Sequence, residues 1–186
     1  MIHNEVTKAI ADRRSIRAYK AEQVTEEELE TVLECGFLAP SGGNGQQWFL
    51  SVVQNQDLLN EISEKVYAWR VANTQSPEEI ERINSRPKSI SLGAPTVIFC
   101  AYPGDQSPVN VSFLAENMVL AAQSIGLGTL YLGGVMAYLK GTEEGRAWVD
   151  AHLQLPEGYE LAYGLSLGYP AESPAAKPRE RKLVRI

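Results

Sequence analysis

Apolar positions along the chain follow two kinds of spacing, one typical of amphipathic helices and one typical of buried strands. Where apolar residues recur every three or four positions, the spacing predicts a helix with one buried face. Where four to eight apolar residues follow one another, the run predicts a strand buried on both faces. We expect helices over about 3–14, 26–36, 57–73, 76–84, 108–125 and 142–153, and strands over about 48–53, 94–101, 129–132 and 159–167.

Capping residues indicate where several of these helices begin and end. Thr25 and Glu28 form a capping-box pattern at the start of the second helix, and Gly36 is expected to stop it. Ser107 is the expected N-cap of the fifth helix, and Pro108 is its expected first residue. This helix is expected to be the longest. Because apolar residues cover more than half of its surface, it should lie centrally or in an interface.

Strands and helices alternate along the chain, and this order predicts a layered α/β arrangement. No repeat or change in composition marks a boundary, and 186 residues fit a single domain over 1–186. After Pro170 the chain is rich in proline and alanine up to Lys177, and residues 183–186 alternate like an edge strand. A tail with so little local structure is expected to lie across something else, such as a second subunit.

Residues 117–139 carry no charge and form a segment long enough to suggest a membrane span. Gln123, Ser124 and four glycines within the segment favour a buried helix end, a buried strand and a glycine loop instead. The first 14 residues are polar and show no signal peptide. We therefore expect a soluble, cytoplasmic protein that does not enter a membrane.

Composition excludes several classes of function. The net charge of -6 and the pI near 5.0 argue against a nucleic-acid-binding protein and against attraction to an anionic membrane. Cys35 and Cys100 match no metal spacing, and we expect both to be free thiols, buried or half-buried. His3 and His152 are the two histidines, which argues against a zinc site and against a Ser-His-Asp triad.

Basic side chains are concentrated near the two ends of this acidic chain. Residues 13–20 hold four of them and residues 177–185 hold five, so nine of the 17 lysines and arginines occupy two short segments. Guanidinium groups bind phosphate in bidentate fashion, and the hydroxyl of Ser15 adds a donor. The two clusters indicate one anionic ligand that both ends of the chain contact. The alternative is a pair of solvated surface patches.

Two glycine-rich segments, 39–48 and 133–134, are further candidates for contacts with a ligand. Residues 39–48 combine three glycines with a serine, an asparagine and two glutamines, so they can approach a planar heteroaromatic ring closely and donate hydrogen bonds to it. The alternative for this loop is a plain flexible turn. Gly133 and Gly134 are expected to end a strand with exposed backbone amides. The chain has no dinucleotide-binding fingerprint and no Walker A sequence, so guanidinium groups would have to hold a phosphate.

Four segments of the chain stand in the order and at the spacing of the FMN-dependent nitroreductase family, which the chain resembles over nearly its whole length. They are 13–19 (RRSIRAY), 39–48 (APSGGNGQQW), 113–134 and 177–179 (KPR). The resemblance implies an α/β (α+β) fold, a three-layer α-β-α sandwich with a central mixed sheet. It also implies a homodimer with two FMN sites at the subunit interface and a C-terminal tail that extends onto the partner.

The resemblance further implies a set of cofactor-binding residues, with no catalytic side chain and no metal ligand among them. One subunit would hold the phosphate and the flavin, and the partner would add the polar loop. The implied residues are Arg13, Arg14, Ser15, Arg17, Lys177 and Arg179, the loop residues Pro40, Ser41, Gly42 and Asn44 with Gln46 near the ring, and the backbone of Leu132, Gly133 and Gly134.

The chain departs from the family pattern in two places. Residues 86–89 read Arg-Pro-Lys-Ser where many relatives have an asparagine and a lysine near the flavin pyrimidine, and Gln47 stands where a proline is usual. A cation near that pyrimidine, Arg17 or Lys88, would favour the reduced cofactor. Relatives differ in their substrate lid over the segment 67–92.

The resemblance implies an oxidoreductase that takes electrons from NADH or NADPH and reduces nitroaromatic, quinone or related electrophilic substrates. Both reactants would use one site in turn, which predicts ping-pong kinetics. Two alternatives stay open. One is a related flavoprotein with different chemistry, such as reductive dehalogenation or flavin modification, and the other is a non-catalytic FMN-binding protein.

Overall fold

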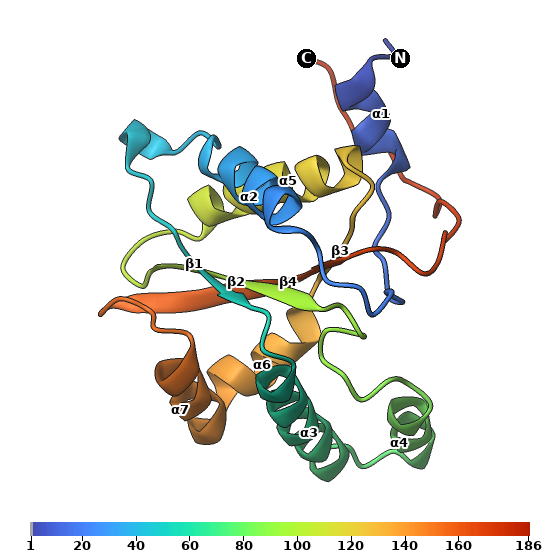
Figure 1. The fold of residues 1–186 in the computed structure, drawn as a ribbon, viewed down its shortest axis with the longest axis vertical. Coiled ribbons are helices and arrows are strands. Elements are labelled where there is room, and N and C mark those ends of the chain that lie inside the picture. The colour runs from blue at the N-terminus through green and yellow to red at the C-terminus, as the bar shows by residue number, and fades with distance from the viewer. Residues whose placement is uncertain (1) are drawn as a thin grey trace.

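The computed structural model of the chain describes residues 2–186 and places a four-stranded sheet between two layers of helices (Figure 1). The helices are α1 (Glu5–Asp12), α2 (Glu26–Phe37), α3 (Gln56–Ala72), α4 (Pro77–Asn84), α5 (Val109–Ser124), α6 (Gly133–Gly141) and α7 (Glu143–His152), with a short 3-10 turn at Gly42–Asn44. The strands are β1 (Phe49–Val53), β2 (Thr96–Pro103), β3 (Gly128–Tyr131) and β4 (Tyr159–Gly168).

Two apolar clusters, one on each face of the sheet, hold the layers together. Side chains alternate along β2, so Val97 and Phe99 join a cluster with α3, α6 and α7. Ile98 and Cys100 point the other way and join a cluster with α2 and α5. Figure 1 shows the same division, with α2 and α5 above the sheet and α3, α6 and α7 below it. The expected three-layer α-β-α sandwich is therefore confirmed.

The strand order is β1-β2-β4-β3, and every pair of neighbours is antiparallel. The expectation of a mixed sheet is therefore wrong, because all four strands pair in antiparallel fashion. Within residues 2–186 the one parallel pairing is an isolated bridge between Ser15 and Thr129. The segment after α1 runs alongside β3 at this point, and the N–H of Ile16 donates to the carbonyl of Thr129 at 3.0 Å. This contact fixes the first basic cluster against the sheet edge.

All the expected helices and strands are present, and one helix is additional. Gly133 and Gly134 were expected to form a loop, but they begin α6. Glycine is a poor helix former, so local propensity did not indicate this helix. Val135, Tyr138 and Leu139 of α6 are buried, and this burial against the sheet stabilises the helix.

Three expected helix details are different in the structure. Helix α5 begins at Val109, one residue later than expected, and no side chain caps it. Helix α3 has 17 residues and is longer than α5, which has 16. Gly36 does not stop α2 but lies buried inside it, where an added Cβ would be 2.6 Å from Cγ of Met118. The absence of a side chain at Gly36 therefore lets α2 pack closely on α5.

Several smaller expectations are confirmed. Thr25 and Glu28 form the capping box of α2, and the Tyr169 hydroxyl after β4 donates to the Glu28 carboxylate at 2.6 Å. Cys35 is a half-buried free thiol and Cys100 a buried one. No helix within residues 2–186 has both the length and the apolar character required to cross a membrane.

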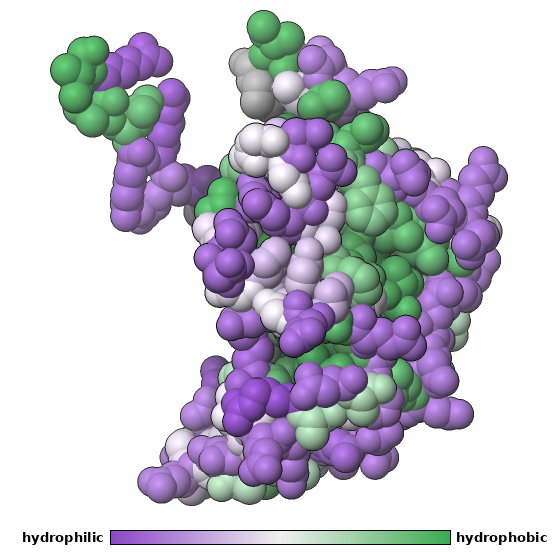
Figure 2. All heavy atoms as spheres, turned by 90° about the vertical axis from the view of Figure 1, so that its left-hand side faces the viewer, coloured by the Kyte–Doolittle hydropathy of each residue, from purple (hydrophilic) through white to green (hydrophobic). Residues whose placement is uncertain are grey.

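The C-terminal tail forms no helix or strand after Pro170 and its bridge. The edge strand expected over 183–186 is absent in the single chain, and Leu183, Val184 and Ile186 are exposed. Figure 2 shows this end of the chain as an arm that stands clear of the body at the upper left. The tail therefore leaves apolar side chains in solvent that its own subunit does not cover.

We predict that Gly145→Ala lowers the free energy of unfolding by about 2–3 kcal/mol, because a Cβ there cannot be accommodated. It would lie 2.1 Å from the carbonyl oxygen of Tyr138 and 2.7 Å from Cα of Leu139, both backbone atoms that cannot rotate away. Urea unfolding followed by tryptophan fluorescence measures the change. Gly141→Ala is the control, since its Cβ would meet nothing within 4 Å. Equal losses in the two variants would contradict the steric explanation.

Candidate functional site

The two basic clusters, far apart in sequence, line one cavity of about 110 Å³. The first cluster contributes Arg13, Arg14, Ser15 and Arg17, and the second contributes Lys177 and Arg179, with Pro174 and Ala175 between them. We call this the basic cavity. The expected meeting of both ends of the chain at one place is confirmed. Two separate surface patches, the alternative left open by the sequence, are therefore excluded for these six residues.

Backbone pairing brings the two ends together. Residues 18–20 run antiparallel to residues 169–171: the N–H of Lys20 donates to the carbonyl of Tyr169, and the N–H of Ala171 donates to that of Ala18, both at 2.9 Å. One residue later, the Glu172 carboxylate accepts a hydrogen bond from the N–H of Arg17. The tail is thus held along the N-terminal segment before it reaches the basic cavity.

None of the five cations of the basic cavity forms an ion pair within residues 2–186, since the Glu172 carboxylate bonds to the backbone N–H of Arg17 and not to its guanidinium group. The ion pairs formed within residues 2–186 are Lys8–Asp12, Lys65–Glu61, Arg82–Glu79 and Lys182–Glu180. Nη1 of Arg14 donates to the carbonyls of Ala11 and Arg13 at 2.8 Å, which orients its guanidinium group without neutralising it. Five unpaired positive charges around so small a space favour an anion with more than one charge.

A second, larger cavity of about 660 Å³ adjoins the first and shares Arg17 and Lys177 with it. We call it the ring cavity, because its size and mixed lining suit a planar ring system. Its apolar lining comes from the segment before β2, from β3 and from the start of α6. The apolar lining residues are Pro87, Ile90, Leu92, Leu130, Leu132 and Val135, with Gly134 at the helix start.

Two arginines that sequence reasoning missed or could not place also line the ring cavity. They are Arg70 on α3 and Arg86 after α4. Burial lowers the pKa of Arg70, and the nearby charge of Arg86 lowers it further. Arg70 belongs to no motif. The one signal that could have found it is its position four residues after the buried Val66, on the inward side of the helix.

Of the two cations expected near the flavin pyrimidine, Arg17 and Lys88, Lys88 does not line the ring cavity. Its ammonium group lies over the Tyr67 ring, 4.4 Å from the centroid. This cation–π contact directs the side chain to the surface of α3. Arg17, the other expected cation, does line the cavity, and Arg86, two residues before Lys88, lines it as well.

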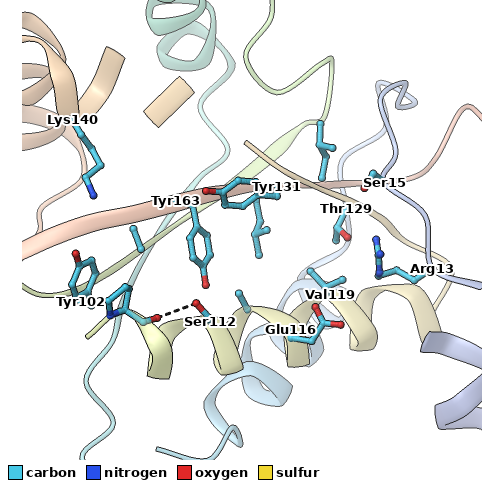
Figure 3. A pocket seen from close by; sticks show the side chains of 15 residues that line it. Arg13, Ser15, Tyr102, Ser112, Glu116, Val119, Thr129, Tyr131, Lys140 and Tyr163 are labelled. Atoms are coloured by element: carbon cyan, nitrogen blue, oxygen red, sulfur yellow. Dashed lines mark hydrogen bonds between the residues drawn. The ribbon is translucent and has the colours of Figure 1, made fainter. Parts of the chain in front are cut away.

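A third cavity of about 640 Å³ lies between α5 and the strands β3 and β4, and it shares Arg13 and Ser15 with the basic cavity. Figure 3 shows Tyr163 pointing from the sheet toward α5, with Tyr131 beside it. The two rings meet edge to face at 5.2 Å between centroids, and the Tyr163 hydroxyl donates to the carbonyl of Val111 at 2.7 Å. Tyr131 is 57% exposed, so this side of the site is open in the single chain.

The polar loop of residues 39–48 is ordered against the start of α5. Oδ1 of Asn110 accepts from the N–H of Gly42 at 3.2 Å, and Nδ2 of Asn110 donates to Oε1 of Gln47 at 2.7 Å. The Ser41 hydroxyl accepts from the N–H of Gln46 at 3.0 Å. These bonds exclude a plain flexible turn. Gln47, which replaces the usual proline, is one of the side chains that fix the loop.

The loop does not reach the basic cavity of its own chain. None of the expected loop residues lines the basic cavity or the ring cavity; they are Pro40, Ser41, Gly42, Asn44 and Gln46. Of the expected backbone contributors, Leu132 and Gly134 line the ring cavity, and Gly133 lies between them. One chain therefore assembles the two basic clusters and the start of α6, but not the polar loop, at one place.

Comparisons with known proteins agree with this geometry. The model of the Nitroreductase family matches residues 10–169. The FMN reductase (NAD(P)H) of Bacillus subtilis is 30% identical over 188 residues, which cover 95% of this chain and 70% of that protein.

Solved structures give the same result. A nitroreductase with bound FMN from Desulfitobacterium hafniense superposes with a TM-score of 0.86 at 28% identity, covering 100% of both chains. A second nitroreductase with bound FMN, from Bacteroides fragilis, superposes with a TM-score of 0.81 at 30% identity. The superposition covers 99% of this chain and 98% of the Bacteroides chain. The chain belongs to the Nitroreductase family.

Proposed function

We propose that this protein is an FMN-dependent oxidoreductase that uses NADH or NADPH to reduce nitroaromatic, quinone or related small electrophiles. One observation carries the proposal: the basic clusters from both ends of the chain meet in one cavity, which shares Arg17 and Lys177 with a ring-sized cavity. The FMN reductase of Bacillus subtilis and the two FMN-bound nitroreductases support it, since they match nearly the whole chain.

The residues present fit FMN, which joins a phosphate dianion to a planar ring through a short chain. Arg13, Arg14, Lys177 and Arg179 would hold the phosphate, since their charges form no ion pair within residues 2–186, and the Ser15 hydroxyl would add a donor. The apolar lining of the ring cavity would contact the ring faces. Bound FMN would supply a two-electron carrier between the nicotinamide donor and the oxidising substrate.

Protein groups at the ring cavity would orient the cofactor and balance its charge. Arg17 lines both cavities, so its positive charge would stabilise negative charge that develops on the ring during reduction. The N–H groups of Gly133 and Gly134 lie in the first turn of α6, where they have no partner within the helix and can donate to the ring. No protein side chain is assigned as a general acid or base.

The overall reaction needs no reactant beyond the donor, a proton and the substrate. For a nitro group, NAD(P)H and one proton convert R–NO₂ to R–N=O and water, with two electrons passed from the donor to nitrogen. Because donor and oxidant would occupy the same cavity in turn, the kinetics would be ping-pong.

We further propose that the protein acts as a homodimer in which the polar loop of one subunit completes the site of the other. The loop is fixed at α5 and lines neither cavity of its own chain. Apolar side chains that suit an interface are exposed on α1 (Val6, Ile10), on α5 (Val109, Phe113) and on the tail. The tail would cross onto the partner through its apolar end.

Arg14→Ala and Arg179→Ala should each weaken FMN binding by about 1.5–3 kcal/mol, the contribution of a hydrogen bond to a charged group. Titration of the apoprotein with FMN, followed by quenching of flavin fluorescence, measures the dissociation constant. Arg181→Ala is the matched control in the same tail, because Arg181 does not line the basic cavity. Unchanged affinity in both cavity variants would show that these arginines do not hold the phosphate.

The purified protein should be yellow, with an absorbance band near ~450 nm from bound flavin. Anaerobic mixing with NADH or NADPH should bleach the band, and steady-state plots against donor and nitroaromatic should give parallel lines. Flavin that neither nicotinamide bleaches would favour reductive dehalogenation or flavin modification. Flavin that no donor reduces productively would favour a binding protein.

Mixed dimers test the shared site. One subunit carries Arg14→Ala and Arg179→Ala, and the other carries Ser41→Ala and Asn44→Ala. If sites are shared, a heterodimer isolated with two different tags has one intact site and should retain about half of the wild-type FMN content. Each variant homodimer should retain little. A heterodimer as empty as the two homodimers would contradict a site built from both subunits.

A further inference from the structure

The ring cavity contains two positive charges more than its expected cofactor requires. Of the basic and ring cavities, Arg13, Arg14 and Arg179 line only the basic one, and Arg17 and Lys177 line both. Arg70 and Arg86 line the ring cavity alone, and no aspartate or glutamate lines it. The phosphate and the reduced ring are already matched by the first five cations, so Arg70 and Arg86 are available for another ligand.

These two arginines come from elements outside the phosphate site. Arg70 lies in the last turn of α3, and Arg86 follows the end of α4, with its N–H donating to the carbonyl of Ile83 at 3.2 Å. The Arg70 guanidinium reaches the start of α6: its Nη2 lies 2.8 Å from where a Cβ on Gly134 would be. Arg70 therefore lies beside the first turn of α6, which would contact the ring, and Arg86 lines the same cavity.

Arg70 carries its charge in a half-buried position near a second positive charge. Burial is the main cause that lowers the pKa of Arg70, and the charge of the exposed Arg86 lowers it further. Neither side chain takes part in an ion pair formed by residues 2–186. An anion bound between them would remove the repulsion. Guanidinium groups are planar forks that match a carboxylate in bidentate geometry.

We propose that Arg70 and Arg86 bind a carboxylate on the oxidising substrate, so that the protein prefers aromatic electrophiles with a carboxylate to neutral ones of the same shape. This inference rests on the proposed function. It assigns the segment 67–92 a role in choosing the substrate, whereas residues 13–17 and 177–179 serve the cofactor.

The test compares 4-nitrobenzoate with 4-nitrobenzamide, which have nearly the same shape but differ by one charge. We expect kcat/KM for the carboxylate to exceed that for the amide in the FMN-loaded wild type. Arg70→Gln and Arg86→Gln should each lower this ratio by roughly tenfold or more, as expected for the loss of a charged hydrogen bond. Arg70→Lys should keep part of the preference. Lys88→Gln is the control and should leave the ratio unchanged, since Lys88 lies over Tyr67.

A binding measurement provides a readout that does not depend on turnover. Benzoate and benzamide are titrated into the oxidised protein as purified, and calorimetry gives both dissociation constants. Benzoate should bind more tightly than benzamide, and Arg70→Gln should remove the difference. Equal affinities in the wild type would overturn the proposal.

Other results would assign Arg70 to the cofactor or to the electron donor, or would contradict the proposed function itself. A shift of the flavin midpoint potential in Arg70→Gln with an unchanged substrate ratio would assign the arginine to the cofactor and overturn the proposal. A changed preference between NADPH and NADH with an unchanged substrate ratio would assign it to the donor and also overturn it. Failure to bind FMN or to reduce 4-nitrobenzamide would instead contradict the proposed function, while selective benzoate binding would still support the carboxylate site.

Discussion

The site depends on holding like charges close together at the edge of a sheet. Unit charges about 4 Å apart in water repel by about 1 kcal/mol, and less at larger separations, and five cations line the basic cavity. Backbone hydrogen bonds oppose this repulsion, at about 0.5–1.5 kcal/mol each. The pairing of residues 18–20 with 169–171 and the bridge from Ser15 to Thr129 supply these bonds. Gly128 lets the segment after α1 lie close to β3, since a Cβ at this position would lie only 2.7 Å from Cγ1 of the buried Ile16.

The three-layer fold provides the rigid frame for this arrangement. Apolar clusters on both faces of the sheet hold the helices in place, and the site forms where β3 ends and α6 begins. The cavities therefore border segments that are less constrained than the core: the stretch after α1, the segment before β2 and the tail. Variation in those segments can change the ligand without changing the layers.

Local information was sufficient to predict much of the fold and part of the site. Periodicity gave the helices and strands, and the density of charge gave the convergence of both ends. Features that depend on distant partners were not predictable. The role of Gly36 depends on Met118, 82 positions later in the chain, and α6 depends on burial that its glycines do not indicate. Lys88 was one of two candidates for the cation near the flavin, but in the fold its ammonium group lies over the Tyr67 ring.

The C-terminal tail contributes to the basic cavity but not to the packing of the fold. Residues 173–186 contribute nothing to either apolar cluster, yet they contain Lys177 and Arg179 of the basic cavity. Exposed segments without regular structure are preferred sites of proteolysis. A single cleavage after Glu172 would leave the sheet and its helices intact and remove two of the five cations. Folding and anion retention can therefore be lost separately in this protein.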